Sequence, residues 1–168
     1  MIIVGAGIGG LAAALACGQA GVRPQVLERA ANFSEVGAGI QMGPNVTRIL
    51  QAWGLADDLK RVGFEPHHLK ARDTQTGQVL GTLRLGQRSL DTYGAPYVTI
   101  HRADLHRVLL QKIMHSGIAE LHLDSEVQAL QQDADGIHIR GTNLPPGVTD
   151  VSKPVAMVGA DGLWSATR

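Results

Sequence analysis

The first third of the chain alternates short apolar runs with a segment of helical character. Residues 1–4 form a β-branched apolar run that ends at Gly5, as a buried parallel strand does. Residues 8–20 are rich in Ala and Leu, and Gly21 stands where a helix commonly ends. A second short strand is expected after Pro24, at residues 25–28. This order predicts a βαβ unit with a right-handed crossover.

The middle of the chain has a different pattern. Residues 34–43 are too rich in Gly for regular structure, so we expect a loop there. Residues 44–54 then carry Val46, Ile49, Leu50 and Trp53 at helical spacing, and residues 55–62 continue as a second short helix. After Pro66, the pattern predicts an antiparallel hairpin from residues 68–73 and 79–85, which flank Thr-Gln-Thr-Gly.

The last part returns to mixed elements. A helix is expected over residues 102–115, because Leu105, Leu109 and Ile113 fall on one face. An irregular connection is expected over residues 141–153. Strands are expected at residues 97–100, 118–123, 126–132, 136–140 and 155–158. The fold class that follows is α/β, a Rossmann-like domain with a parallel sheet and inserted antiparallel hairpins.

Composition and charge narrow the class of partner. The 168 residues include 15 Lys plus Arg and 15 Asp plus Glu, so no overall field attracts nucleic acid or an acidic membrane. A single cysteine fits a reducing, cytoplasmic location. The first 22 residues carry no charge, which is compatible with a membrane helix or a signal peptide. Because four glycines interrupt the front half of this run and no Lys or Arg precedes it, we predict no membrane insertion.

The first turn carries the strongest chemical motif. Gly5, Gly7 and Gly10 fit G-x-G-x-x-G between a predicted strand and a predicted helix, where a pyrophosphate can meet the helix N-terminus. Glu28 follows Gly10 by eighteen residues, at the end of the second strand, where a carboxylate can accept both ribose hydroxyls. It would repel a 2′-phosphate, so the dinucleotide is expected to be FAD or NAD. The alternative is that the glycines only permit close packing and Glu28 is a solvated strand end.

Other candidate residues are less specific. Arg102 begins a predicted helix, so its guanidinium could bind a cofactor phosphate or ribityl chain, or could be an ordinary surface group. The seven histidines lack the spacing of an HExxH or Cys-x-x-Cys site, and we predict no metal. Cys17 lies in an Ala- and Leu-rich segment and is expected to be a small core residue.

Four stretches together resemble the aromatic-ring hydroxylases, the single-component flavoprotein monooxygenases that use FAD and NAD(P)H. They are VGAGIGGLAAALA with LERA, GAGIQMGPN, HRADLHRVL and VGADGLWSATR. The last is the most specific, because Asp161, Gly162, Ser165 and Arg168 match the family's Asp-Gly motif. GAGIQMGPN is most similar to the branch that hydroxylates salicylate and 3-hydroxybenzoate.

The resemblance implies a role for each motif. The Gly-rich turn and Glu28 would hold the ADP half of FAD, with Arg29 beside it and Arg102 at the middle of the cofactor. The loop that contains Gln41 would approach the isoalloxazine. Asp161 and Gly162 would lie beside the cofactor, in a segment linked to both FAD and NAD(P)H binding.

The resemblance also implies the wider reaction and its missing parts. NADH or NADPH would reduce the bound FAD, and O2 would supply the oxygen placed on an aromatic, phenolic acid substrate. Residues 1–168 would be the N-terminal part of the FAD-binding domain, with residues 67–100 as the first piece of the substrate-domain sheet. The family's later Gly-Asp motif has no counterpart here, so we expect an incomplete domain that is inactive alone. We assign no catalytic residue, and a homodimer is a possible assembly of the whole enzyme.

Two other functions are compatible with the same first turn. An NAD-dependent dehydrogenase would share the βαβ unit, although it would continue to alternate strand and helix after residue 64, where this chain turns to hairpins. A non-catalytic nucleotide-binding fragment that needs a partner to complete it is the other alternative.

Overall fold

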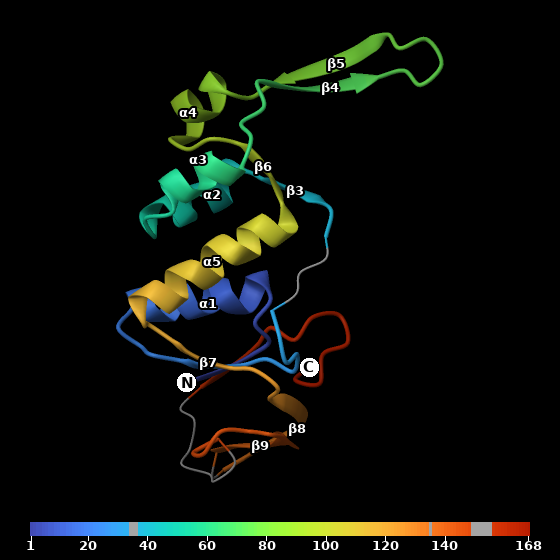
Figure 1. Cartoon of the computed structure of the whole chain (residues 1–168). Coiled ribbons are helices and arrows are strands. Elements are labelled where there is room, and N and C mark those ends of the chain that lie inside the picture. The colour runs from blue at the N-terminus through green and yellow to red at the C-terminus, as the bar shows by residue number, and fades with distance from the viewer. Residues whose placement is uncertain (34–36, 135, 149–155) are drawn as a thin grey trace. The chain divides into compact units, whose positions relative to one another are not determined.

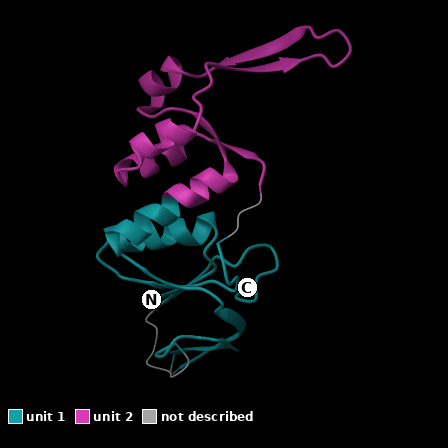
Figure 2. Cartoon of the chain, viewed as in Figure 1, with its two compact units in different colours: residues 1–35, 109–168 teal, residues 36–108 magenta. Residues whose placement is uncertain are grey.

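The computed structural model of the chain describes residues 1–33, 37–134, 136–148 and 156–168. The chain divides into two compact units, which are described separately here (Figure 2). Unit 1 consists of Met1–Glu35 with Leu109–Arg168, and unit 2 consists of Val36–Val108.

A four-stranded parallel sheet forms the centre of unit 1. The strand order is β10 (Met157–Gly159), β1 (Ile2–Val4), β2 (Gln25–Leu27) and β7 (Glu120–His122), and every neighbouring pair is parallel. α1 (Ile8–Gln19) connects β1 to β2, which confirms the predicted βαβ unit and the Rossmann-like class. The chain runs outward from β1 to β7 and then returns to the other side of β1 as β10. The topological switch point therefore lies between β1 and β10.

Both faces of this sheet are covered. Ile2, Val4 and Leu27 pack on one face against the hairpin of β8 (Glu126–Asp133) and β9 (Gly136–Thr142), together with Val148. Side chains alternate along a strand, so Ile3 and Val26 point to the opposite face, where Figure 1 shows α1. Ile3 and Val26 are fully buried, as are Leu11 and Leu15 of α1. The short strands thus read as continuous apolar runs because water reaches neither face.

Unit 2 is built on a small antiparallel pair, β3 (Gly39–Met42) with β6 (Val98–His101). α2 (Pro44–Ala52), α3 (Ala56–Val62) and α4 (Gln87–Tyr93) belong to the same unit, and α5 (Arg102–Ser116) begins in it and ends in unit 1. Thr47 of α2 is fully buried, and its hydroxyl donates to the Pro96 carbonyl oxygen at 2.6 Å, which offsets the cost of burying this polar group. The predicted helix over residues 102–115 is confirmed, with Leu105, Leu109 and Ile113 all buried.

The hairpin of β4 (His68–Arg72) and β5 (Val79–Arg84) extends from unit 2, as predicted (Figure 1). Every residue of both strands is exposed. Its turn is held by Asp73, whose carboxylate accepts the backbone N–H of Thr76 at 2.6 Å. Hydrogen bonds from Thr76 lower the pKa of Asp73. This hairpin leaves the apolar side chains of Leu69, Val79, Leu80 and Leu83 in contact with water.

Several details differ from the sequence-based expectation. The expected loop over residues 34–43 contains β3 at Gly39–Met42, because pairing with β6 satisfies a Gly-rich backbone that local propensity leaves irregular. Residues 34–36 and 149–155 lie outside the described residues, so the expected loop, connection and last strand are tested only in part. α4 was not expected at all. On α2 the buried residues are Thr47 and Leu50, whereas Ile49 is exposed.

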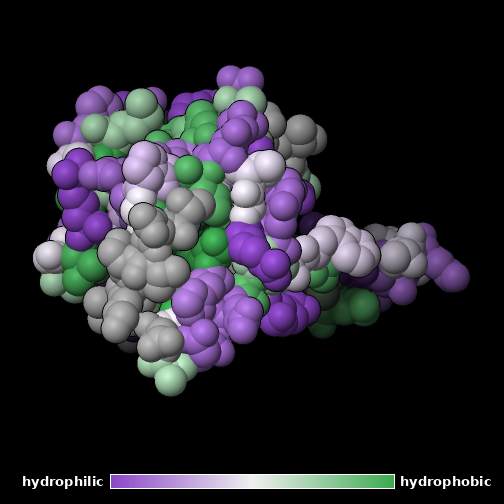
Figure 3. Space-filling view, turned by 90° about the horizontal axis from the view of Figure 1, so that it is seen from below, coloured by the Kyte–Doolittle hydropathy of each residue, from purple (hydrophilic) through white to green (hydrophobic). Residues whose placement is uncertain are grey.

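Polar and apolar side chains share the outer surface. Figure 3 shows hydrophilic side chains interleaved with hydrophobic ones on the face seen there. None of the helices in the described part of the chain combines the length and the apolarity that a bilayer crossing needs. The main apolar clusters of unit 1 instead lie inside it, on the two faces of the sheet.

The packing of the β8–β9 hairpin on the sheet can be tested at Leu27, which is 1% exposed. We expect Leu27→Ala to lower the free energy of unfolding by about 2–5 kcal/mol, because it leaves a cavity in this cluster. Urea denaturation followed by circular dichroism measures the loss. The control is Leu80→Ala at a position that is 68% exposed, which we expect to change stability by less than about 0.5 kcal/mol. Equal losses for the two variants would contradict the described packing.

Candidate functional site

The candidate site of unit 1 lies at the carboxyl edge of its parallel sheet. Ala160 directly follows β10, and its N–H donates to the Val4 carbonyl oxygen at 2.8 Å. The Gly5 N–H donates to the Leu27 carbonyl oxygen at 2.7 Å. The chain therefore leaves β1 and β10 side by side at the switch point, which is where open α/β sheets bind their ligands.

The Gly-rich turn packs closely on its neighbours. Gly5 has φ +97°, and a Cβ on it would lie 2.5 Å from the Ala160 carbonyl oxygen. A Cβ on Gly10 would overlap the carbonyl oxygen of Gly5. Only glycine fits at either position, because the first needs a left-handed backbone and the second needs α1 to lie against the turn.

The N-terminus of α1 suits a negatively charged ligand. Gly7 is its N-cap residue, with φ −68° and ψ −178°, and provides no side-chain cap. The first turn contains no acidic residue. Neither an N-cap side chain nor an acidic residue of the first turn therefore offsets the partial positive charge at the first N–H groups of α1. These are the properties with which helix N-termini hold phosphates.

Glu28 lies at the end of β2 and contacts the same turn. Its Oε2 atom accepts the Ala6 N–H at 2.8 Å, and its Oε1 atom accepts the Ala30 N–H at 2.9 Å. An ionised carboxylate offers about four acceptor positions, so about two remain for the hydroxyl groups of a ligand. Arg29 is the next residue and is exposed. Glu28 thus joins β2 to the Gly-rich turn and can still bind a ribose.

Asp161 organises the loop that follows β10. Its Oδ1 atom accepts the hydroxyl groups of Ser165 at 2.7 Å and Thr167 at 2.9 Å. Its Oδ2 atom accepts the backbone N–H groups of Ala166 at 2.8 Å and Thr167 at 3.1 Å. Gly162 comes next, with φ +82°. The carboxylate of Asp161 is therefore occupied by its own loop, and the loop presents its backbone at the switch point.

These hydrogen bonds also set the charge state of Asp161. Partial burial raises the pKa of this carboxyl group, but the hydrogen bonds from Ser165 and Thr167 outweigh burial and hold the pKa below its usual value. The carboxylate is therefore fully ionised at neutral pH. A charged acceptor makes each of these bonds stronger than a neutral one would.

Unit 2 brings together the other two predicted site residues. Gln41 lies on β3, and its Oε1 atom accepts the Tyr97 hydroxyl at 2.6 Å. Arg102 directly follows β6, and its N–H donates to the Ala38 carbonyl oxygen at 3.2 Å. The Arg102 side chain also runs along Gly37, where a Cβ would approach it to 2.8 Å. The β3–β6 pairing therefore places Gln41 and Arg102 on neighbouring segments of one unit.

Sequence reasoning missed some residues of these sites. Thr167 gives two of the four hydrogen bonds to Asp161, and no local signal singled it out. Tyr97 was expected only as the start of a strand, and its hydroxyl finds Gln41 through strand pairing. Within the described residues, no three His, Cys, Asp or Glu side chains gather as metal ligands would. Cys17 is half-buried, and its thiol lies 3.2 Å from the Met1 sulfur.

The role of Asp161 can be tested through pH. We expect Asp161→Asn to cost about 1–3 kcal/mol at pH 7 and to speed hydrogen exchange at the Ala166 and Thr167 N–H groups. The folded pKa is lowered, so the stabilisation is fully present above the ordinary Asp pKa of about 3.9 and is lost as pH falls through the folded value. The stability gap between wild type and variant should therefore narrow below about pH 4. Urea denaturation at pH 3 and pH 7 measures it, and an unchanged gap would contradict this role.

Known proteins that resemble the chain include a monooxygenase and a hydroxylase. The 6-hydroxynicotinate 3-monooxygenase of Pseudomonas fluorescens is 44% identical over 166 residues, which are 99% of this chain and 41% of that protein. The 3-hydroxybenzoate 6-hydroxylase 1 of Aquipseudomonas alcaligenes is 36% identical over 168 residues, which are 100% of this chain and 41% of that protein. The crystal structure of P. aeruginosa PqsL with 2-aminobenzoylacetate matches with a TM-score of 0.79 at 28% identity, over 98% of this chain and 43% of PqsL.

The chain thus spans about two fifths of the length of these relatives. A family model described as the FAD binding domain matches residues 1–168, the whole of the chain. Its relatives include aromatic-ring hydroxylases, as the sequence motifs implied. The chain belongs to the FAD binding domain family.

Proposed function

We propose that the chain is the FAD-binding part of a monooxygenase that hydroxylates an aromatic, phenolic acid substrate with NAD(P)H and O2. The observation that carries this proposal is the convergence at one switch point of an uncapped helix N-terminus, a Gly turn without room for side chains, and Glu28. Family membership makes FAD the dinucleotide expected there. Bound FAD supplies the redox chemistry, and the protein supplies binding and position.

Unit 1 is proposed to hold the ADP half of FAD. The pyrophosphate would meet the backbone at Gly5, Gly7 and Gly10, where no side chain stands in its way. Glu28 would accept the ribose hydroxyls with the acceptor positions that Ala6 and Ala30 leave free. Arg29 is exposed next to Glu28 and would lie beside the same half of the cofactor.

The remaining site residues are proposed to hold the rest of the cofactor. Arg102 would donate to its middle portion, and Gln41 would approach the isoalloxazine. Asp161 acts through its loop, because its own oxygens are occupied, and Gly162 would present backbone to the cofactor. In this arrangement the Asp161 carboxylate does not itself contact the cofactor, so Asp161 is a positioning residue.

The wider organisation is proposed on the same basis. Residues 1–168 would be the N-terminal part of an FAD-binding domain, with residues 67–100 as the first piece of the substrate-domain sheet. The exposed apolar side chains of β4 and β5 support this, since further strands would cover them. A cytoplasmic homodimer reduced by NADH or NADPH is the proposed form of the whole enzyme. The chain alone is expected to be inactive, which the alternative of a non-catalytic nucleotide-binding fragment also predicts.

Flavin retention tests the proposed cofactor. We expect the purified chain, mixed with FAD and freed of excess, to keep visible flavin absorption at near one FAD per chain. The physical reason is that unit 1 is proposed to hold the ADP half, whereas Gln41 and Arg102 are proposed to hold the flavin half, which NAD lacks. NAD, added in place of FAD, should not be retained. Retention of NAD instead of FAD would favour the dehydrogenase alternative. If the chain retains no flavin, the same measurement is made on a polypeptide extended to the length of the relatives, and absence of flavin there too would contradict the proposal.

The ribose contact can be tested by Glu28→Gln. The amide keeps the side-chain shape but loses one acceptor oxygen, so it cannot accept from both Ala6 and Ala30 and also bind a ribose. We expect FAD affinity to fall by at least tenfold, measured by quenching of flavin fluorescence. The matched control is Glu120→Gln. Glu120 begins β7, at the edge of the sheet opposite to Glu28, and the change removes the same charge from an exposed surface pair with Arg23. A similar loss in the control would exclude a specific role for Glu28.

A further inference from the structure

A second candidate site lies wholly within unit 2. It is a pocket of about 380 Å³, formed by residues of α2, β5, α4 and the segment before β6. Three arginines line it, Arg48 from α2, Arg84 from the end of β5 and Arg88 from α4. Its volume is within the range of small-molecule sites.

The charge of this pocket is one-sided. Among the described residues that line it, none is an Asp or Glu, and the three arginines form no ion pair with any described residue. Two other arginines of unit 2 form ion pairs, Arg61 with Asp58 and Arg107 with Asp104. Three guanidinium groups that line one pocket without a carboxylate repel one another, and an anionic ligand would relieve this repulsion.

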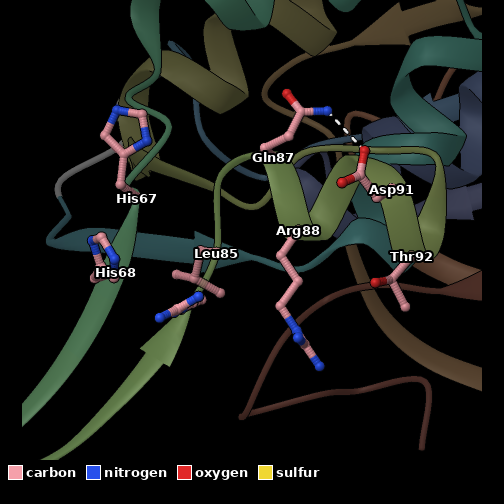
Figure 4. Close-up of a pocket in the computed structure, with 8 residues that line it drawn as sticks. His67, His68, Leu85, Gln87, Arg88, Asp91 and Thr92 are labelled. Atoms are coloured by element: carbon pink, nitrogen blue, oxygen red, sulfur yellow. Dashed lines mark hydrogen bonds between the residues drawn. The ribbon is translucent and has the colours of Figure 1, made fainter.

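The neighbouring carboxylate does not neutralise this charge. A pocket of about 520 Å³ adjoins the first, shares Arg84, Leu85 and Arg88 with it, and includes Asp91. The Asp91 Oδ1 atom accepts the Gln87 side chain at 2.8 Å. Figure 4 shows that the Arg88 side chain extends away from this Gln87–Asp91 pair. The arginine pocket therefore keeps its positive charge.

The rest of the lining suits an aromatic ring. Tyr93 and Tyr97 line the pocket together with Leu83 and Leu85. Because the Tyr97 hydroxyl donates to Gln41, that ring has a fixed position and can offer a flat apolar face. Guanidinium groups also stack on aromatic rings. A small inorganic anion would use the arginines and leave these apolar groups without a partner.

We propose that this pocket binds an aromatic ring that carries two negative charges, such as an aromatic dicarboxylate, and that Arg84 and Arg88 determine this specificity. Two charges match the pocket better than one, because a single carboxylate leaves two of the three guanidiniums unneutralised. That this ligand is a substrate of the enzyme rests on the proposed function. The hydrogen bond from Tyr97 to Gln41 connects the pocket to the residue proposed to approach the isoalloxazine.

Calorimetric titration of the 168-residue chain without FAD tests the proposal. The probes are isophthalate with two carboxylates, benzoate with one, the uncharged isophthalamide, and inorganic phosphate. We expect isophthalate to bind at least tenfold more tightly than the other three. Arg84→Gln and Arg88→Gln should each weaken isophthalate binding by about tenfold, which is the effect of one charge-assisted hydrogen bond.

Lys70→Gln is the matched control, because it removes one positive charge from the exposed strand β4 outside the pocket. It should leave isophthalate affinity unchanged, and circular dichroism should show the native fold for all variants. Equal affinity for isophthalate and isophthalamide, or for isophthalate and phosphate, would overturn the proposal, as would an equal loss in Lys70→Gln. Absence of isophthalate binding would also overturn it. Flavin retention is measured separately, so a chain that keeps FAD but binds no isophthalate refutes this inference alone.

Discussion

The close approach of three backbone segments at Gly5 is the constraint on which unit 1 depends. At this point β1 ends, α1 begins at Ile8, and Ala160 follows β10. The turn has no space for a Cβ at Gly5 or Gly10, so the helix and both strands can meet without side chains between them. The same lack of side chains leaves backbone N–H groups and the helix dipole facing the crevice. One packing requirement therefore produces both the fold of the unit and its capacity for a phosphate ligand.

Two carboxylates support this junction in different ways. Glu28 binds the turn through Ala6 and keeps acceptor capacity for a ligand, whereas the Asp161 carboxylate accepts hydrogen bonds from Ser165, Ala166 and Thr167. Burial and hydrogen bonding act in opposite directions on the pKa of Asp161, and hydrogen bonding prevails. An acidic residue at a candidate cofactor site thus need not contact the cofactor. Here one of them shapes the loop that carries the backbone.

Unit 2 shows how function can be divided between segments. Its β3–β6 pair places Gln41, Tyr97 and Arg102 on adjoining segments, and the pocket with Arg48, Arg84 and Arg88 lies in the same unit. The exposed apolar hairpin of β4 and β5 adds an unpaired edge to this unit. A chain that spans about two fifths of its relatives therefore already contains the groups proposed to face the cofactor and those of the candidate ligand pocket.

The sequence by itself determined the βαβ unit, the Gly-rich turn, Glu28 and the family, because these depend on local periodicity and on fixed spacing within about thirty residues. It determined the β4–β5 hairpin for the same reason. Only the tertiary structure decided that part of a Gly-rich loop becomes β3, since the partner strand β6 begins 56 residues after its paired residue Met42. It also decided that Thr47 rather than Ile49 is buried, and that three arginines from separate elements share a pocket. Such pairings depend on contacts between distant segments, which no local pattern encodes.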